Sequence, residues 1–268
     1  YESLDGKTQT IKDIIENNHE ISKNIIEAKK PMIIFGESFF KSSSAEYLFQ
    51  SFKKFLIDKN KFNDEWNPLN IISTDAATVG NLDLDIINQN NNLLKDLNEN
   101  KFEIVFLFGQ DNLKINKRDE FIIYIGSHGD KGAELADIIL PGAAYTEQSG
   151  HFTNLEGKIQ KAYKASYPPG DAKEDWQIIN DLAEFMNNRK LFNDKEELES
   201  SMFNYLKLKE EKQGSILNTG NYSNQFKNED LKIFVKDYYF SNVIARSSKT
   251  MLNCYNSKLE TKRTGTEG

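Results

Sequence analysis

The chain has 268 residues and a formal net charge of −7, which argues against the clustered cationic surface that nucleic-acid binding requires. This length allows one large domain or two small ones, each with a substantial core. No uncharged apolar stretch in the sequence approaches the roughly 20 residues that cross a bilayer. Cys254 is the single cysteine, and one thiolate cannot close an internal disulfide or hold an iron–sulfur cluster, which takes about four ligands.

Helices and short strands alternate through the first part of the chain. Isoleucines between Ile11 and Ile26 recur mostly at intervals of three and four residues, which places them on one face of a helix. A run of four apolar residues that ends at Gly36 is typical of a parallel strand buried on both faces. We therefore expect helices at residues 11–28 and 45–56, and strands at 32–35 and 70–73.

The alternation continues with a weaker helix near Leu94 and three more strands. Residues 103–109 are the clearest run of the kind expected for a strand buried on both faces. Because parallel strands need crossovers, and crossovers are usually helical, this order indicates a parallel sheet with helices on its faces. We therefore predict strands at 103–109, 121–126 and 137–140 in a doubly wound α/β domain that spans residues 28–190 and follows an N-terminal helix in residues 1–27.

A small β-hairpin and a C-terminal extension are predicted after the sheet. The hairpin covers residues 152–160, where Gly157 supplies a positive φ at the turn. We expect Asp171 to be the N-cap of the following helix, with Glu174 as its capping-box partner. The remaining expected segments are a polar connection at 191–230 with a surface helix at about 195–211, and a C-terminal segment and tail at 231–268 whose last ordered part is 231–259.

Several motifs occur together in this part of the sequence. They are SHGDKGA at 127–133, ADIILPGAAYTE at 136–147, TNLEGKIQ at 153–160, PPG at 168–170 and EDW at 174–176. Together they resemble the molybdopterin oxidoreductase superfamily. Within it, residues 140–147 and the terminal segment 237–254 are most similar to the family of 75 kDa subunits of respiratory complex I. The likeness extends from about Lys30 to Leu259, without the cysteine-rich N-terminal region of that family.

The resemblance implies a portion of a proton-translocating NADH:ubiquinone oxidoreductase that scaffolds the iron–sulfur electron path and carries no electrons itself. Iron–sulfur clusters are then expected in the N-terminal half of the subunit, as a separate chain or a missing part. Further expected partners are the flavoprotein and other hydrophilic-arm subunits, on the matrix side of the mitochondrial inner membrane or the cytoplasmic side of a bacterial one. The alternative is a fragment of a catalytic molybdopterin oxidoreductase of the formate dehydrogenase or nitrate reductase type.

His128 and Lys131 lie in a glycine-flanked loop after a predicted strand, a position that often approaches anions or cofactors. No glycine-rich fingerprint with the required strand-to-helix spacing completes the loop, so we interpret it as structural. By the resemblance, the loop keeps the shape of the superfamily's cofactor cleft without the ligand. His19 and His151 have no partners at metal-ligand spacing. We therefore predict no catalytic, cofactor-binding or metal-binding residue in this chain.

Three carboxylates, those of Asp137, Glu147 and Glu156, could form an acid–base set. Asp137 opens a strand and Glu156 lies in a tight turn, where carboxylates more often accept hydrogen bonds from backbone N–H groups. Cys254 has no histidine nearby in sequence, so we expect a buried, unreactive thiol rather than a nucleophile. The aromatic residues 238–240 would suit either a subunit contact or the core beneath a terminal helix.

Overall fold

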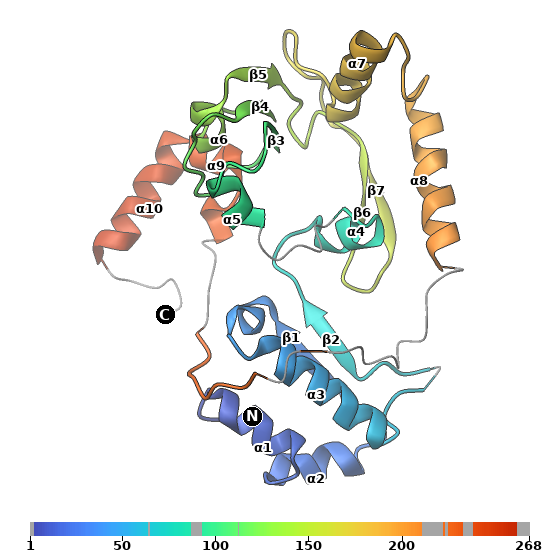
Figure 1. Ribbon diagram of the computed structural model, residues 1–268, viewed down its shortest axis with the longest axis vertical. Helices are drawn as coiled ribbons and strands as arrows, with labels where there is room; N and C mark the ends of the chain where they lie inside the picture. The colour runs from blue at the N-terminus through green and yellow to red at the C-terminus, as the bar shows by residue number, and fades with distance from the viewer. Residues whose placement is uncertain are drawn as a thin grey trace. The chain divides into compact units, whose positions relative to one another are not determined.

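The structure is a computed structural model that describes residues 3–63, 65–86, 93–111, 113–210, 222, 225–232 and 238–261. The chain divides into two compact units, whose elements are labelled in Figure 1. Both units contain parallel strand pairs, and a hairpin and C-terminal helices complete the described chain, which confirms the predicted α/β class. Unit 1 comprises Tyr1–Gly80, Thr153–Lys158 and Leu206–Val235, and unit 2 comprises Asn81–Phe152, Ile159–Tyr205 and Lys236–Gly268.

Unit 1 begins with two short helices. Asn17 has a φ of 63°, a left-handed conformation that asparagine tolerates and that ends the first helix. His19 then caps the second helix, because its Nδ1 accepts a hydrogen bond of 3.2 Å from the backbone N–H of Ile21. The prediction of one helix over residues 11–28 is therefore wrong. The two helices are α1 (Thr8–Ile15) and α2 (Glu20–Glu27).

The core of unit 1 is built around Phe35, which lies on a strand. Its ring centroid is 4.5 Å from that of Phe39 and 5.8 Å from that of Phe52, in the tilted and edge-on arrangements that aromatic pairs favour. The two strands of this unit pair in parallel, and a helix connects them, as predicted. The elements are β1 (Ile33–Gly36), the 3-10 helix η1 (Glu37–Lys41), α3 (Ala45–Asp58) and β2 (Leu69–Ile72).

A three-stranded parallel sheet forms the centre of unit 2, in the order β3-β4-β5. Leu107, Ile122 and Tyr124 are buried on one face, where Ala133 and Leu135 of α6 pack against them. The three predicted strands and the helix before them are confirmed in position. α4 (Thr78–Asp83) begins in unit 1 and ends in unit 2. The other elements are α5 (Leu93–Asn98), β3 (Ile104–Phe108), β4 (Phe121–Gly126), α6 (Lys131–Leu135) and β5 (Ile138–Pro141).

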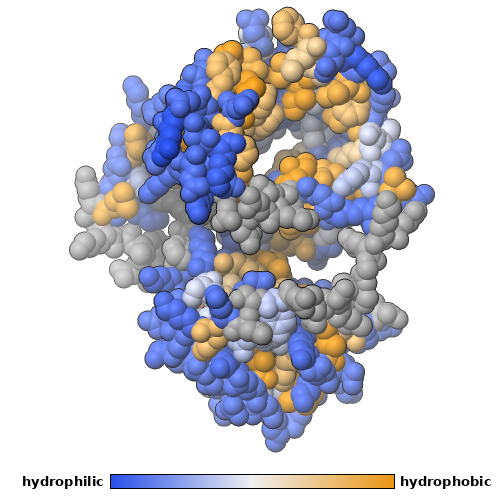
Figure 2. Space-filling view, in the orientation of Figure 1, coloured by the Kyte–Doolittle hydropathy of each residue, from blue (hydrophilic) through white to orange (hydrophobic). Residues whose placement is uncertain are grey.

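Alternate residues along the strands differ strongly in exposure. On β3, Leu107 is 3% exposed, whereas Phe106 and Phe108 on the opposite face are 41% and 45% exposed. On β1, Phe35 is buried and Ile34 is 51% exposed. Successive side chains of a strand point to opposite faces, and at these positions the described residues bury only one of them. The prediction that these strands are buried on both faces is therefore wrong, and Figure 2 shows apolar residues at the surface of both units.

The hairpin turns at Gly157, whose φ of 81° confirms the predicted positive value. The helix after it is capped by Glu174, whose backbone N–H donates to Gln177 Oε1 at 3.2 Å in a capping box. The predicted N-cap at Asp171 is therefore wrong, because that residue precedes the helix by a full turn. The elements are β6 (Gly150–Thr153), β7 (Ile159–Ala162), α7 (Asp175–Asn187) and α8 (Lys195–Glu210), the last confirming the expected surface helix.

The C-terminal part of the described chain is helical. Phe240 stacks on Tyr255 with ring centroids 4.6 Å apart, whereas Tyr239 is 76% exposed. Cys254 lies beside Tyr255 on the same helix and is exposed, so the predicted buried thiol is wrong. The helix turns Tyr255, not the cysteine, towards Phe240. The elements are the 3-10 helix η2 (Tyr238–Phe240), α9 (Val243–Ser247) and α10 (Lys249–Thr261).

Across the described residues, no helix combines the length and apolar character needed to span a membrane. Most of the polar connection expected after α8, and the tail beyond residue 261, lie outside the described residues. The domain boundaries predicted at residues 27, 190 and 230 stay predictions.

Candidate functional site

The carboxyl end of β4 is the first candidate site, because open parallel sheets bind ligands at the carboxyl ends of their strands. The strand ends at Gly126, and the chain then forms the loop that contains His128 before α6 begins. His128 is held by its neighbours: its Nδ1 lies 3.0 Å from Ser127 Oγ, and its backbone carbonyl lies 3.0 Å from the Tyr124 hydroxyl. The loop predicted to be structural is therefore anchored to the strand beneath it.

The side chain of Tyr124 lies buried beneath this loop, with 1% of its surface exposed. Its hydroxyl lies 3.2 Å from Asp111 Oδ2 and 3.0 Å from the His128 carbonyl, so it donates to one of these acceptors at a time. Burial, together with the neighbouring Asp111 carboxylate, raises the pKa of Tyr124 to about 12. The hydroxyl therefore keeps its proton at neutral pH and acts as a hydrogen-bond donor.

Asp111 lies just beyond the end of β3, and its side chain is fully buried. Its Oδ1 accepts a hydrogen bond of 3.0 Å from the Gly132 N–H at the start of α6, and its Oδ2 lies 3.6 Å from Arg246 Nη2. A buried carboxylate is costly unless it is paired and hydrogen-bonded. Asp111 meets both conditions through groups of this chain.

Arg246, on α9, closes the site from the C-terminal part of the chain. Its Nε donates to Asp130 Oδ2 at 2.7 Å, and its Nη1 donates to the Ser241 carbonyl at 2.7 Å. Asp130 is also the N-cap of α6, because its Oδ1 accepts from the Lys131 N–H at 2.9 Å. Burial acts to raise the pKa of Asp130, but the hydrogen bonds from Arg246 and Lys131 outweigh burial and lower it. The carboxylate is thus ionised and paired.

The other predicted carboxylates do not gather into one site. Asp137 Oδ2 accepts from the Ile122 N–H at 2.8 Å, which confirms its predicted role as a backbone acceptor. Glu147 likewise accepts from a backbone N–H, that of Ala144, at 2.9 Å. The prediction for Glu156 is wrong, because the side chain that accepts the backbone hydrogen bonds of that turn is Asn154. Its Oδ1 accepts from the N–H groups of Lys158 and Glu156 at 2.9 and 3.0 Å. The Glu156 carboxylate instead accepts a side-chain hydrogen bond, from Asn154 Nδ2 at 3.4 Å.

Within the part of the chain that the structure describes, no group of three or more His, Cys, Asp or Glu side chains could hold a metal ion. His19 caps α2, and the ring of His151 meets that of Phe203 edge-on with centroids 5.2 Å apart. Both histidines thus have structural contacts.

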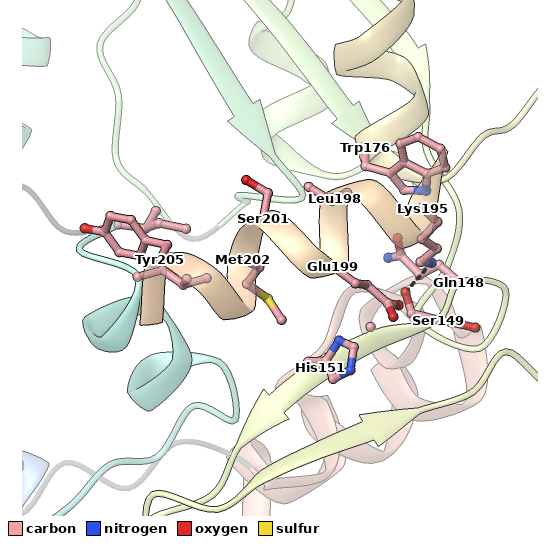
Figure 3. A pocket seen from close by; sticks show the side chains of 13 residues that line it. Gln148, Ser149, His151, Trp176, Lys195, Leu198, Glu199, Ser201, Met202 and Tyr205 are labelled. Atoms are coloured by element: carbon pink, nitrogen blue, oxygen red, sulfur yellow. Dashed lines mark hydrogen bonds between the residues drawn. The ribbon is translucent and has the colours of Figure 1, made fainter. Parts of the chain in front are cut away.

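A second candidate site is a pocket of about 500 Å³ in unit 2, shown in Figure 3. Trp176, Leu198 and Met202 give it a mainly apolar wall. Its lysine, Lys195, forms an ion pair with Glu174 and donates to a backbone carbonyl at 2.6 Å. The pocket is therefore a mainly apolar recess whose lysine is already paired within the chain.

Glu199 is the acidic group of the pocket. The hydrogen bond from Lys161 Nζ to Glu199 Oε2, 2.8 Å long, is the main cause of a lowered pKa of Glu199, which burial opposes. His151 also faces this carboxylate and lowers the same pKa further. The Glu199 carboxylate is therefore ionised at neutral pH and serves as an ion-pair partner of the hairpin strand β7.

A sequence profile for molybdopterin oxidoreductase matches residues 1–185, well over half of the chain. The chain belongs to the molybdopterin oxidoreductase family. A second profile, for the C-terminal part of the NADH-ubiquinone oxidoreductase subunit designated G, matches residues 197–254 of this family member. The resemblance predicted from the motifs is therefore confirmed.

Three relatives show how much of a longer protein the chain matches. It is 33% identical over 262 residues to the NADH-ubiquinone oxidoreductase 75 kDa subunit of Reclinomonas americana, covering 94% of this chain and 38% of the relative. It is 34% identical over 260 residues to the mitochondrial 78 kDa subunit of Candida albicans, covering 90% and 35%. It is 34% identical over 275 residues to the NADH-quinone oxidoreductase subunit of the same designation from Rickettsia typhi, covering 97% and 38%. The chain thus spans somewhat over a third of their lengths.

The loop after β4 does not fit the cofactor for which the molybdopterin oxidoreductase family is named. A phosphate-bearing cofactor needs donors that face it, but the N–H groups of Lys131 and Gly132 and the guanidinium of Arg246 are engaged by carboxylates of the same chain. A Cβ on Gly132 would lie 2.4 Å from the Gln110 carbonyl oxygen, so this glycine serves close packing within the protein. The loop therefore supports no chemical step through a pterin.

Asp111 and Arg246 were not singled out from the sequence, although they hold the loop together. Arg246 lies in the terminal segment that carries the family resemblance. A charged residue within that segment was the one sign in the sequence that Arg246 could have a role. Its partner Asp130 is 116 residues away in the chain. Neither periodicity nor motif spacing reveals a pairing over that separation.

Proposed function

We propose that this chain is a structural part of the largest peripheral-arm subunit of respiratory complex I. In this role it scaffolds the iron–sulfur path from NADH to ubiquinone in a proton-translocating complex. The chain itself contributes no catalytic residue, cofactor ligand or metal ligand. The relatives named as NADH-ubiquinone and NADH-quinone oxidoreductase subunits support this assignment.

The observation that carries the proposal is the ion pair between Arg246 and Asp130. Asp130 lies in the segment that matches molybdopterin oxidoreductase, and Arg246 lies in the segment that matches the C-terminal part of the NADH-ubiquinone oxidoreductase subunit. The second segment therefore closes the loop at which the wider family would approach a ligand. A closed loop whose charged groups are paired with one another suits a rigid support rather than a catalytic cleft.

The physical contribution of such a support is geometric. Electron transfer between clusters falls off steeply with distance, so a body that fixes cluster-bearing neighbours affects the rate without carrying charge. The clusters themselves belong to the cluster-bearing N-terminal half of the subunit, on a separate chain or on the same one, because Cys254 alone cannot ligate a cluster. The other proposed partners are the flavoprotein and further hydrophilic-arm subunits.

We place the complex at the matrix side of a mitochondrial inner membrane, with the cytoplasmic side of a bacterial inner membrane as the alternative. Relatives from both settings match the chain, since one is named mitochondrial and another comes from Rickettsia typhi. Fractionation followed by immunodetection of this chain distinguishes the two locations.

The deciding experiment is a native gel of detergent-solubilised membranes, probed with an antibody to this chain and stained for NADH dehydrogenase activity. Co-migration of the two signals in a large assembly, with iron but no stoichiometric molybdenum or tungsten in the purified assembly, is the expected result. One atom of molybdenum or tungsten per copy of this chain would instead support a catalytic molybdopterin enzyme. A chain that migrates alone would refute the assignment to complex I.

A further inference from the structure

One face of the sheet in unit 2 carries a cluster of exposed apolar side chains, which we name the open face. The parallel register pairs Ile104 with Phe121 and Phe106 with Ile123, and Ile123 in turn with Ile138. Register partners in a sheet share a face, and residues two apart on a strand do as well. Ile123 and Ile125 share this side of the sheet but are more buried. The open face is therefore the exposed part of this side, formed by Ile104, Phe106, Phe108, Phe121 and Ile138.

The open face differs sharply from the face behind it. Its five side chains are between 41% and 57% exposed, whereas Leu107, Ile122 and Tyr124 on the covered face are at most 3% exposed. α6 supplies the cover on that side through Ala133 and Leu135. The contrast holds along β3 and at the start of β4, whereas towards the carboxyl end Ile125 on the open side is 2% exposed and Ile139 on the other side is 54% exposed. Contiguous apolar surface of this kind marks an interaction site in a soluble protein.

The outer edge of β3 is a second exposed feature beside the open face. β3 is the terminal strand in the order β3-β4-β5, and among the described residues no other strand pairs with its outer edge. Its sequence, IVFLF, contains no charge or proline that would discourage pairing with another strand. An apolar edge strand next to an apolar face is the surface on which a sheet continues into further polypeptide.

The relatives indicate which polypeptide this is. The chain covers 90% or more of its own length in each alignment but only 35–38% of the length of each relative. In those proteins the matched segment is therefore accompanied by a longer stretch of the same polypeptide.

We infer that the open face and the outer edge of β3 are covered by the polypeptide that corresponds to the unmatched part of these relatives, which extends the sheet past β3. The inference rests on the proposed function, because it takes the cluster-bearing part of the subunit as the occupant. That polypeptide supplies a β-strand to β3 and an apolar helix face to Phe106. This strand and helix cover the open face, on the side of the sheet opposite α6. The polypeptide that supplies them belongs either to this chain or to a separate one.

Site-specific crosslinking in the intact assembly tests this inference. A photoreactive phenylalanine analogue at position 106 is expected to yield adducts with peptides that align with the unmatched part of the relatives. The control carries the analogue at Phe185, which is 88% exposed and lies on α7 rather than on the sheet, and it should give at least tenfold fewer of these adducts. Adducts from position 106 to a second copy, to residues 1–268 of the same chain, or to another subunit would overturn the inference.

A substitution pair provides an independent readout. Phe106→Asp is expected to lower incorporation into the assembly at least tenfold, whereas Phe185→Asp should leave incorporation within twofold of the unaltered chain. Phe106→Leu, which keeps an apolar side chain, should restore incorporation. Equal incorporation of the two Asp variants would contradict the inference, and the crosslinks remain decisive if Phe106→Asp does not fold. The two proposals can fail separately. If the unaltered chain co-migrates with NADH dehydrogenase activity but the analogue at position 106 crosslinks to other peptides than those aligned with the unmatched part of the relatives, the inference fails and the proposed function stands.

Discussion

Arg246 and Asp130 form an ion pair of 2.7 Å across 116 residues of sequence, and Asp130 uses its other oxygen to cap α6. The same guanidinium lies 3.6 Å from the buried carboxylate of Asp111. One cation therefore serves two carboxylates at the carboxyl end of the sheet. Removing it would leave a buried negative charge without its partner.

We predict that Arg246→Ala lowers the free energy of unfolding of unit 2 by about 1–3 kcal/mol, because the buried Asp111 carboxylate loses its charged neighbour while the Asp130 pair is only part-buried. Arg246→Lys should cost less, because it keeps the charge but not the planar fork. The measurement is urea unfolding followed by Trp176 fluorescence in a Trp66→Phe background, since Trp66 belongs to unit 1. The exposed Arg189 supplies the control, Arg189→Ala. A loss below about 1 kcal/mol for Arg246→Ala would show that the pair is solvated.

Gly132 should be intolerant of any side chain. A Cβ there would lie 2.4 Å from the Gln110 carbonyl oxygen and 2.9 Å from Asp111 Oδ1, so Gly132→Ala should cost about 1–3 kcal/mol of stability. Gly129 is in the same loop and has only the Ala133 Cβ near the equivalent position, at 4.0 Å. Gly129→Ala should therefore be close to neutral in the same fluorescence assay. Similar costs for the two variants would mean that the packing around α6 relaxes freely.

A substitution at Gly157 tests the cost of backbone conformation alone, because a side chain there would have space. A Cβ at Gly157 or at Gly150 would have no other atom within 4 Å, but of the two only Gly157 has a positive φ, of 81°. Gly157→Val should cost at least about 1–2 kcal/mol, because a left-handed backbone resists a side chain, and it should reduce the amount of assembled complex. Gly150→Val lies in a strand and should have little effect. Cluster reduction potentials measured by EPR should be unchanged in the complex that remains, and altered potentials with normal assembly would speak against a supporting role.

The raised pKa of Tyr124 predicts a loss of stability at high pH. The folded-state value of about 12 exceeds the ordinary value of 10.0, so between these values the unfolded chain loses the phenol proton while the folded chain keeps it. Stability should fall by about 1.4 kcal/mol per pH unit in this window. Tyr124→Phe should show a shallower decline than the unaltered chain when urea midpoints are compared at pH 9.5 and 11. Parallel declines would show that the hydroxyl ionises freely in the folded state.

Local patterns predicted most elements of the fold. Apolar runs located β3, β4 and β5 because strands of this kind are marked by short stretches of β-favouring residues. The helix break at Asn17 was missed because the isoleucine spacing continues on both sides of it and only the backbone φ reveals the end. Exposure was misjudged for Phe106 and Cys254, since periodicity says which residues share a face but not whether anything covers that face.

The candidate site was predictable only in outline. The loop around His128 was found because glycines and a preceding strand mark the carboxyl edge of a sheet. Asp111 and Arg246 escaped notice because their role depends on contacts between segments far apart in the chain. A carboxylate that follows a strand has many possible partners, and the sequence does not rank them.

The contacts of helix α1 have a consequence for synthesis on the ribosome. Thr8 Oγ1 donates to the Lys227 carbonyl at 2.9 Å and accepts from the Glu229 N–H, also at 2.9 Å, while the Leu231 N–H donates to the Gly6 carbonyl at 2.7 Å. These bonds join residues more than 200 positions apart, so α1 waits for nearly the whole described chain to emerge before it gains its final neighbours. The isoleucines of α1 can pack on α3 much earlier, so it is the hydrogen bonds of the buried Thr8 that form last, and the amino-terminal end of α1 is completed only late in folding.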